Sequence, residues 1–554
     1  MTEDGAKVQV AAVADRLWDD MLELWPLIGT SVGDDRADDR LDDLGEDGRA
    51  DQERRLRHAA DAAAAIERTS LADDDRAMLD IVDAITGRGL AQLHHRLDRL
   101  QAANHLAGPA TTLGDVASLQ LADTSERLDR YVGRLRSFPT YLEQAAQVVR
   151  EGVDTGVVPP RVVAERTVAA LDRLLALDVH ESPALIPVAD GSDADRDRVI
   201  AAVREAVNPA HESFAAMLRD ELLPHATETI GITALPGGDA LYATEIFGWT
   251  SLPLDPLETH ELGLERFAAI QQERHEVAAS LGYSTPAEGI AAHTASGANT
   301  ATTPEQLVAM AEDQVRRSWE VAPSFFGMLP SANCQVRRVE EFREADSPFA
   351  FYLPPTEDGS RPGTYYINAY DLPDRALHHV ASVTYHESNP GHHFQIAIEQ
   401  EMAGRPPLRR FGAGMASGAF VEGWGLYAER LADEMDLYLD GWERLGLLDN
   451  QAHRAARLVT DTGIHALGWS RERSITLLED GGQTHTDAVI EIDRYIALPG
   501  QALCYMIGLI EIERAREAST TGAHDAASLR AFHDRVLSLG QLPLPSFRRV
   551  FGTG

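Results

Sequence analysis

One short segment constrains this chain more than any other, because it combines several histidines with a pair of residues that breaks helices. The sequence from His386 reads HESNPGHHFQ. Zinc hydrolases commonly carry His-Glu-x-x-His on one helix, so that the two histidines lie one turn apart and the glutamate between them acts as a base. Here Pro390 stands where the second histidine is expected. An unbroken helix would place neither His392 nor His393 within reach of a metal held by His386.

A proline inside a helix removes a hydrogen bond and disrupts the turn, and the glycine that follows it accepts almost any backbone conformation. We therefore predict a two-residue bulge at Pro390 and Gly391 that returns His392 to the position of the second ligand. His393 is the alternative ligand if the bulge is smaller. A histidine-rich helix break in a protein core, without a metal, is the competing interpretation.

A catalytic zinc ion needs a third protein ligand and leaves its fourth position to water. The candidate is Glu422, in the segment FVEGWGLYAE, because a glutamate among apolar residues is costly unless it is paired or coordinated. Glu429 lies seven residues further on the same helix face, where its carboxylate can orient a ligand histidine. We expect His393, if it is not a ligand, to lie beside the ligands as well. For Glu429, an ordinary ion pair with Arg430 or Arg457 is the alternative.

The composition excludes several classes of protein. The formal net charge of −38 argues against binding to nucleic acid or to an anionic membrane, because both need a basic face. Two cysteines, Cys334 and Cys504, exclude a disulfide scaffold and a Cys-rich zinc module. The first ten residues, MTEDGAKVQV, contain neither the basic segment nor the apolar segment of a signal peptide. No run of residues approaches the ~18 apolar residues of a membrane span. We therefore expect a cytoplasmic protein.

Hydrophobic periodicity predicts a mainly α-helical protein. Apolar residues at three- and four-residue spacing mark helices over about 8–24, 51–66, 76–106 and 160–177. The exception is a strand-turn-strand pattern, in which FAFYL at 349–353 and TYYIN at 364–368 flank the turn-rich sequence PPTEDGSRPG. We predict a β-hairpin there. It can bind an extended peptide by main-chain pairing if it borders a cleft, and the alternative is a hairpin that only covers helices.

These motifs resemble a known family. HESNPGHHFQ, FVEGWGLYAERL, DTGIHALGWS and PGQALCY are similar to the bacterial family catalogued as domain of unknown function 885, and the similarity covers most of the chain. That family resembles the thermostable carboxypeptidases of the Taq type and, more distantly, neurolysin-like peptidases. In the neurolysin-like enzymes, the segment matching Glu422 carries the third zinc ligand, whereas the Pro-Gly insertion departs from their pattern and leaves the second histidine open.

The resemblance implies a large, multi-helix, two-lobed body with a deep cleft, a small β-hairpin or sheet and one zinc ion per chain. We expect an N-terminal helical lobe over residues 1–240 and a catalytic helical lobe with the zinc site over residues 241–554. One continuous domain is the alternative.

The expected mechanism is hydrolysis by water that zinc activates. Glu387, next to the first ligand, takes a proton from this water and passes it to the leaving amine. The developing oxyanion needs a second donor, for which His465 and Tyr505 are the candidates, although Tyr505 can equally be a core tyrosine. Arg494 and Arg457 are candidates for binding a substrate carboxylate, because a guanidinium makes two parallel hydrogen bonds. Each arginine can instead form a structural ion pair.

Three functions remain open from the sequence. The leading hypothesis is a carboxypeptidase-like zinc metallopeptidase that hydrolyses short peptides. The second is a zinc amidohydrolase acting on a small non-peptide amide, and the third is an inactive binding protein with a peptidase fold. Glu387 argues against the third, because a binding protein has no need of a base beside the metal. We expect no nucleic-acid or membrane partner, and related folds suggest a homodimer.

Overall fold

The structure, a computed structural model, describes residues 3–69, 71–341, 344, 347–357, 359, 361–416, 418–520 and 526–553. These residues are mainly helical, as predicted, with one small sheet. The chain forms two compact units. Unit 1 comprises Met1–Glu67, Ile85–Thr244 and Asp493–Pro499, and unit 2 comprises Arg68–Ala84, Glu245–Ile492 and Gly500–Gly554. The sequence analysis divides the chain once, near residue 240, whereas both units of the structure are discontinuous along the sequence.

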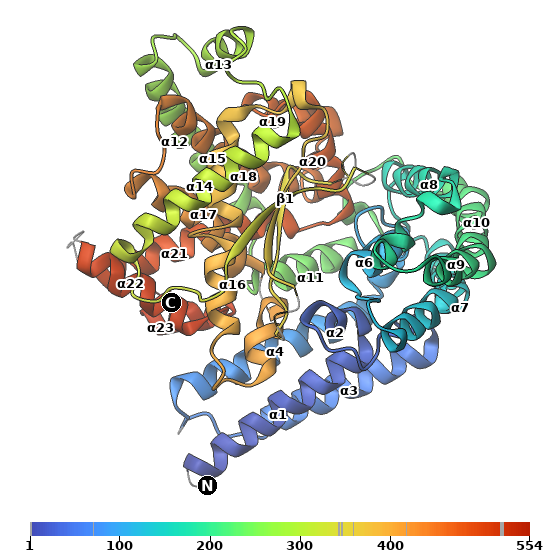
Figure 1. Ribbon diagram of the computed structural model, residues 1–554. Helices are drawn as coiled ribbons and strands as arrows, with labels where there is room; N and C mark the ends of the chain where they lie inside the picture. The colour runs from blue at the N-terminus through green and yellow to red at the C-terminus, as the bar shows by residue number, and fades with distance from the viewer. Residues whose placement is uncertain are drawn as a thin grey trace. The chain divides into compact units, whose positions relative to one another are not determined.

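Unit 1 is built from helices (Figure 1). They are α1 (Glu3–Leu24), α2 (Pro26–Val32), α3 (Glu46–Ala64), α5 (Asp98–Gln101), α6 (Thr112–Leu119), α7 (Ser125–Thr155), α8 (Arg161–Ala176), α9 (Asp193–Ala202) and α10 (Asn208–Met217). Three further helices run from one unit into the other: α4 (Asp73–His95), α11 (Gly238–Thr250) and α20 (His485–Ala497).

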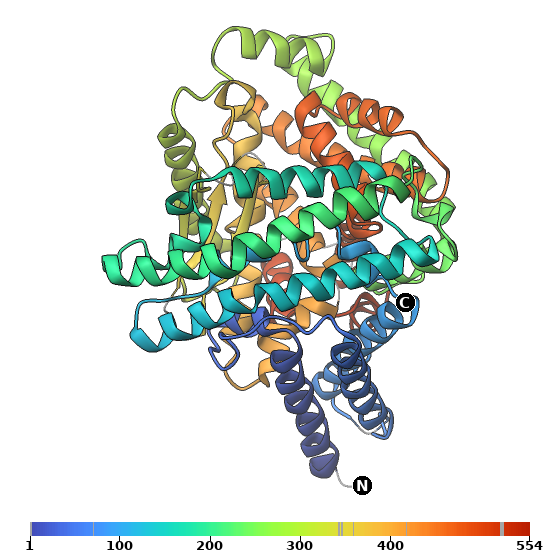
Figure 2. The same ribbon diagram turned by 90° about the vertical axis from the view of Figure 1, so that its right-hand side faces the viewer.

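The core of unit 1 lies along α7, which spans 31 residues and begins where the Thr124 hydroxyl accepts a hydrogen bond from the Arg127 N–H. Figure 2 shows α7, α8 and α10 side by side. Tyr131 and Phe138 of α7 and Phe214 of α10 are buried there. The Tyr131 hydroxyl donates to a backbone carbonyl, which satisfies its polar group inside this apolar core.

Unit 2 holds most of the residues that the sequence analysis singled out. Its helices are α12 (Pro256–Ser280), α13 (Pro286–Ala295), α14 (Pro304–Phe325), α15 (Val380–Glu387), α16 (His392–Gln400), α17 (Gly418–Glu434), α18 (Gly441–His465), α19 (Arg471–Asp480), α21 (Cys504–Thr520), α22 (Ala526–Leu539) and α23 (Leu544–Phe551). No single helix among the described residues is long and apolar enough to cross a membrane, although the bent pair His485–Ala497 and Gln501–Thr520 meets that test jointly by length and composition.

Helix α18 runs through the centre of unit 2 and packs against α12 and α15. Its residues are buried almost continuously from Leu445 to the end of the helix, and many of them are polar, among them Asp449 and Gln451. A polar side chain is costly to bury unless it is hydrogen-bonded, so a helix of this kind usually serves more than packing. Both of these side chains take part in the groups described below.

Helices α17 and α21 cross at two glycines. A Cβ atom on Gly423 would lie 2.3 Å from the carbonyl carbon of Gly508, and one on Gly508 would lie 1.8 Å from the carbonyl oxygen of Ala419. No side chain fits between the two backbones. The crossing therefore holds α17, which carries Glu422 and Glu429, directly against α21 (Figure 1).

The sheet has three strands, β1 (Cys334–Arg338), β2 (Ala350–Leu353) and β3 (Gly363–Ile367), in the order β1-β3-β2. The predicted hairpin is confirmed, because β2 and β3 pair antiparallel with Ala350 opposite Ile367. Strand β1 was not predicted. It pairs parallel to β3, and such a pair has no short turn between its strands that would mark it in the sequence. Helix α14 packs on β1 and α15 packs on β2, so the sheet lies beside the helix that carries His386.

Candidate metal centre

The predicted helix break lies between α15 and α16. Helix α15 ends at Glu387 and α16 begins at His392, so the interruption is longer than the two-residue bulge expected from the sequence. The carbonyl of Pro390, within the interruption, accepts a hydrogen bond of 2.9 Å from the indole N–H of Trp424. Because this carbonyl is satisfied by α17, the chain can turn here and present His392 to the end of α15.

The break brings together the three residues predicted as metal ligands. Glu422 Oε2 lies 3.4 Å from His386 Nε2 and 3.5 Å from His392 Nε2. One ligand atom from each residue lies within 4.8 Å of the other two. A tetrahedral zinc ion with bonds of about 2.1 Å separates its ligand atoms by about 3.4 Å, so this arrangement fits zinc.

A buried carboxylate fixes the tautomer of His386. His386 Nδ1 donates to Glu429 Oε1 at 2.8 Å, and Glu429 Oε2 accepts from Gln451 Nε2 at 2.9 Å. When the ring carries a single proton, on Nδ1, the lone pair of Nε2 is directed toward Glu422 and His392. This carboxylate–histidine arrangement is the usual support for a metal-binding imidazole.

Gly425 of α17 lies against the His386 ring. A Cβ atom at this position would lie 2.5 Å from His386 Cε1 and 2.7 Å from Nε2. The absence of a side chain at Gly425 therefore leaves room for the ring between Glu422 and Glu429, each of which lies about one turn along α17 from this glycine.

Charges in the group shift several pKa values. Burial alone would lower the pKa of His386, but hydrogen bonds to Glu422 and Glu429 outweigh it and raise this pKa to about 9. Burial would raise the pKa of Glu422, yet its contacts with His386 and His392 lower it well below the usual range. The pKa of Glu387 is raised, chiefly by burial and further by Glu422. A carboxylate with a raised pKa suits a general base that works near neutral pH.

Solvent can reach the group. The side chain of Glu422 is 20% exposed, and Glu387 is half-buried, whereas His386 and His392 are almost fully buried. The Nδ1 atom of His392 is buried without a hydrogen-bond partner among the described residues. The two histidines are therefore enclosed by protein, while the side of the group at Glu422 is open to a water molecule or a substrate.

Tyr505 and Arg457, two of the other predicted residues, lie next to this group. The Tyr505 ring stacks on the His386 ring, with 6.5 Å between the centroids. The Arg457 guanidinium carbon lies 4.2 Å from the centroid of the Tyr505 ring, and its Nη2 pairs with Glu491 at 2.7 Å. Arg457 is therefore both a neighbour of the site and a member of an ion pair.

The remaining predicted residues are His393, His465 and Arg494. His393 follows His392 on α16, but its Nδ1 contacts the Tyr352 hydroxyl at 2.8 Å and its Nε2 contacts the Ala332 carbonyl at 2.9 Å. His465 is buried in the last turn of α18 and is in neither group of metal-ligating side chains found among the described residues. Arg494 belongs to unit 1.

Two residues of the site were not singled out from the sequence. Gln451 completes the hydrogen bonding of Glu429, and Trp424 holds the helix break. The run of polar residues within α18 is the one sequence signal that could have pointed to Gln451, because a helix buried on all sides should otherwise be apolar. Trp424 lies within the segment FVEGWGLYAE, where only its hydrogen bond distinguishes it from a core aromatic residue.

A comparison with protein-family models gives a match over most of the chain. The family model described as "Bacterial protein of unknown function (DUF885)" matches residues 26–550. A crystal structure of a protein from Colwellia psychrerythraea, described as a presumed lipoprotein, is 26% identical with a TM-score of 0.92, over 99% of this chain and 98% of that one. A second structure, of a presumed lipoprotein of unknown function from Shewanella oneidensis, is 19% identical with a TM-score of 0.73, over 98% and 99% of the two chains. A comparison with curated proteins found no match.

Proposed function

This chain belongs to the DUF885 family of bacterial proteins, and from that premise we propose that it is a zinc-dependent metallopeptidase that hydrolyses short peptides. One observation carries the proposal: His386, His392 and Glu422 converge with zinc-like spacing, and Glu387 directly follows the first of them. A binding site for a structural metal would need no free carboxylate at this position, whereas a hydrolase needs a base there.

When bound, zinc supplies the Lewis acidity that makes water a nucleophile near neutral pH. The side chains of this protein do the rest. Glu387 accepts the proton of the attacking water and transfers it to the leaving amine. Glu429 keeps His386 in the tautomer that presents Nε2. Tyr505, stacked beside His386, and His465, at the end of α18, are the candidate donors to the developing oxyanion.

The sheet favours a peptide substrate over a small amide. β1 and β2 are the outer strands of the described sheet, and β2 packs on α15, the helix that carries His386 and Glu387. An outer strand can bind an extended peptide through main-chain hydrogen bonds. Arg457, next to Tyr505, is the candidate for binding the terminal carboxylate of such a peptide, in line with a carboxypeptidase-like preference.

The test combines metal analysis with a peptide digest. We expect the purified full-length chain to hold at this site one zinc ion that is lost in His386→Ala and Glu422→Ala variants, and to cleave members of a peptide library. Zinc without peptide cleavage would favour the amidohydrolase. Full retention of this zinc in either variant would contradict the ligand assignment.

Glu387→Gln separates catalysis from binding. This variant keeps the size of the side chain but removes the proton acceptor, so it should bind zinc normally and lose at least ~100-fold in turnover. Glu261→Gln, at an exposed position of α12, is the control and should keep full turnover. Loss of zinc together with activity in Glu387→Gln would mark Glu387 as a ligand and refute its role as a base.

Location and assembly remain predictions for this chain. The description as lipoproteins applies to the Colwellia and Shewanella proteins. We propose a cytoplasmic location, which cell fractionation tests, and a homodimer, which light scattering of the purified protein tests.

A further inference from the structure

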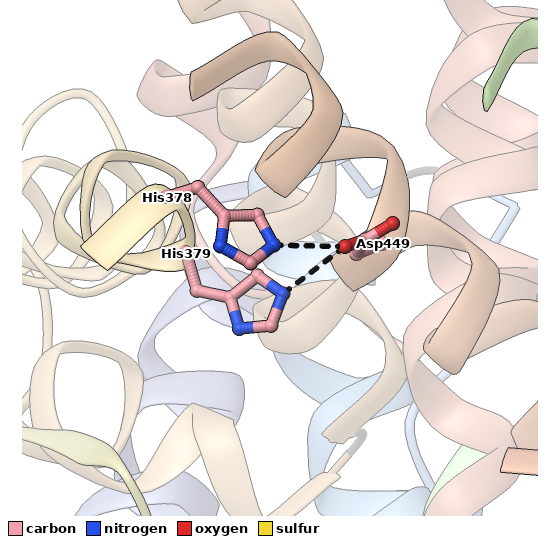
Figure 3. A group of neighbouring side chains, drawn as sticks. All are labelled: His378, His379 and Asp449. Atoms are coloured by element: carbon pink, nitrogen blue, oxygen red, sulfur yellow. Dashed lines mark hydrogen bonds and ion pairs between the residues drawn. The ribbon is translucent and has the colours of Figure 1, made fainter. Parts of the chain in front are cut away.

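A second group of metal-ligating side chains lies elsewhere in unit 2. His378 and His379 end the 3-10 turn η9 (Leu377–His379), which leads into α15, and Asp449 lies on α18. One ligand atom from each of the three lies within 4.8 Å of the other two. Figure 3 shows both rings directed at the same carboxylate oxygen. His378 Nε2 lies 3.0 Å and His379 Nε2 3.3 Å from Asp449 Oδ2.

The convergence of two adjacent histidines on one atom is unusual. Consecutive residues on a helical turn point in different directions and do not normally meet. Here the two rings lie 4.0 Å apart, tilted by 41°, and both present Nε2 to Asp449 (Figure 3). His378 and Asp449 are buried, whereas the side chain of His379 is 15% exposed, so the group has one side open to solvent.

Hydrogen bonding at Asn299 determines which nitrogen of His378 carries the proton. The backbone N–H of His378 can only donate, and it bonds to the side-chain oxygen of Asn299 at 3.0 Å. The same oxygen lies 2.9 Å from His378 Nδ1, so Nδ1 must be a donor as well. The Asn299 amide nitrogen in turn donates to the Thr294 hydroxyl, which is consistent with this orientation.

With its proton on Nδ1, a neutral His378 ring turns the lone pair of Nε2 toward Asp449 Oδ2. Two acceptor atoms 3.0 Å apart need a cation between them, either a second ring proton or a metal ion. Nitrogen and oxygen ligands around a tetrahedral metal with bonds of about 2.1 Å lie about 3.4 Å apart, close to the two separations found here.

The other oxygen of Asp449 is held separately. Arg274 Nε donates to Asp449 Oδ1 at 2.7 Å, and both side chains are buried. This bond orients the carboxylate and leaves Oδ2 free for the histidines, as is usual for metal-binding carboxylates. The guanidinium also repels a nearby cation, so a metal should bind here more weakly than between His386, His392 and Glu422.

We propose that His378, His379 and Asp449 bind a second divalent transition-metal ion, with a water molecule as the fourth ligand. Two imidazoles and a carboxylate suit zinc and its neighbours better than calcium or magnesium. The ion would connect the turn before α15 to α18. Helix α15 carries His386, and α18 carries Gln451, which donates to Glu429. This second site does not depend on the proposed peptidase activity.

The test counts zinc in the full-length protein at a buffered excess of free zinc. We expect two zinc ions in the wild-type chain, one in His386→Ala, one in His379→Ala and none in the double variant. His293→Ala is the control, because His293 stacks on Trp442 near this group and is not a ligand, and it should keep both ions. The His386→Ala background separates the two sites, so a failure of the first assignment does not hide the second.

Two further variants distinguish the loss of a ligand from a folding defect. His379→Gln should lose the same ion while its circular dichroism stays unchanged, since His379 is the partly exposed member. Asn299→Ala should weaken zinc binding in the His386→Ala background by about 10- to 100-fold, because it removes the anchor of His378. The proposal is overturned if His386→Ala holds no zinc, or if its zinc is unaffected by His379→Ala; the group would then be a hydrogen-bonded histidine pair.

Discussion

Glu429→Gln tests the support of the candidate metal centre with a minimal change of shape. The carboxylate accepts from His386 Nδ1 at 2.8 Å and from Gln451 Nε2 at 2.9 Å, and it is fully buried. A glutamine offers only one acceptor. Its amide nitrogen must face either the Nδ1–H of His386 or the amide of Gln451, and both are donors in the wild-type arrangement.

The expected cost follows from this conflict. If the amide nitrogen faces His386, the ring must move its proton to Nε2 and can no longer bind the metal through that atom. If it faces Gln451, that side chain must rotate and the charge beside the imidazole is still lost. Changes of this kind typically weaken metal binding 10- to 100-fold, or about 1.4–2.8 kcal/mol.

Competition with a chelator of known affinity measures the effect, since it reports the dissociation constant of zinc directly. Glu434→Gln is the matched control: it lies on the same helix, but it is part-exposed and pairs with Arg516. It should change the zinc affinity by less than about twofold, because surface ion pairs contribute little. An unchanged affinity in Glu429→Gln would show that the contact with His386 does not support metal binding.

Two other variants test the packing and the charge of unit 2. Gly425→Ala should lower zinc affinity at least ~10-fold and leave the helix content unchanged. The added Cβ atom would force the His386 ring to move by more than the ~0.5 Å that a metal site tolerates. Normal zinc binding by this variant in a chelator titration would contradict the prediction. Burial raises the pKa of Glu399 to about 7, although Arg409 lowers it in part. In the unfolded chain the same carboxyl has a pKa of about 4.5, so its ionisation lowers the stability of the fold progressively between about pH 4.5 and 7. Above about pH 7 the whole loss of stability is present. Glu399→Gln should therefore match the wild type near pH 4 and be more stable by about 2–3 kcal/mol at pH 8 in urea unfolding, and an equal difference at both pH values would refute the assignment.

Local patterns were enough to predict the helical class and the β2–β3 hairpin. Both depend on contacts between residues close in sequence, whose periodicity and turn residues can be read directly. Strand β1 could not be found in this way. Its partner in the sheet, β3, lies beyond a long connection, and no short hairpin turn joins the two strands.

The residues of the candidate metal centre were predictable, with one alternative left open. The sequence names His386, Glu422 and, after the break, His392, with His393 as the alternative. The choice between His392 and His393 depends on how the chain turns, and one residue changes the direction of a side chain on a helix by about 100°. The structure turns His393 to Tyr352 instead.

The second group was not predictable at all. Asp449 lies about seventy residues beyond His378 and His379, and nothing in either local sequence marks them as neighbours. A pair of adjacent histidines is by itself no signal of a metal site. Only the packing of the turn η9 against α18 brings the three side chains together.

The contact between Gly423 and Gly508 also has a consequence for how the protein comes apart. Where two backbones touch, neither helix can shift along the other or loosen by a change of side-chain rotamers, so α17 and α21 must separate in one step. This part of unit 2 should therefore not unfold locally, unlike many loops, which open well below the melting temperature of a protein. Amide protons along the crossing should exchange with solvent only through global unfolding of unit 2, and a metal bound at the candidate centre should be released by heat at the temperature at which unit 2 melts.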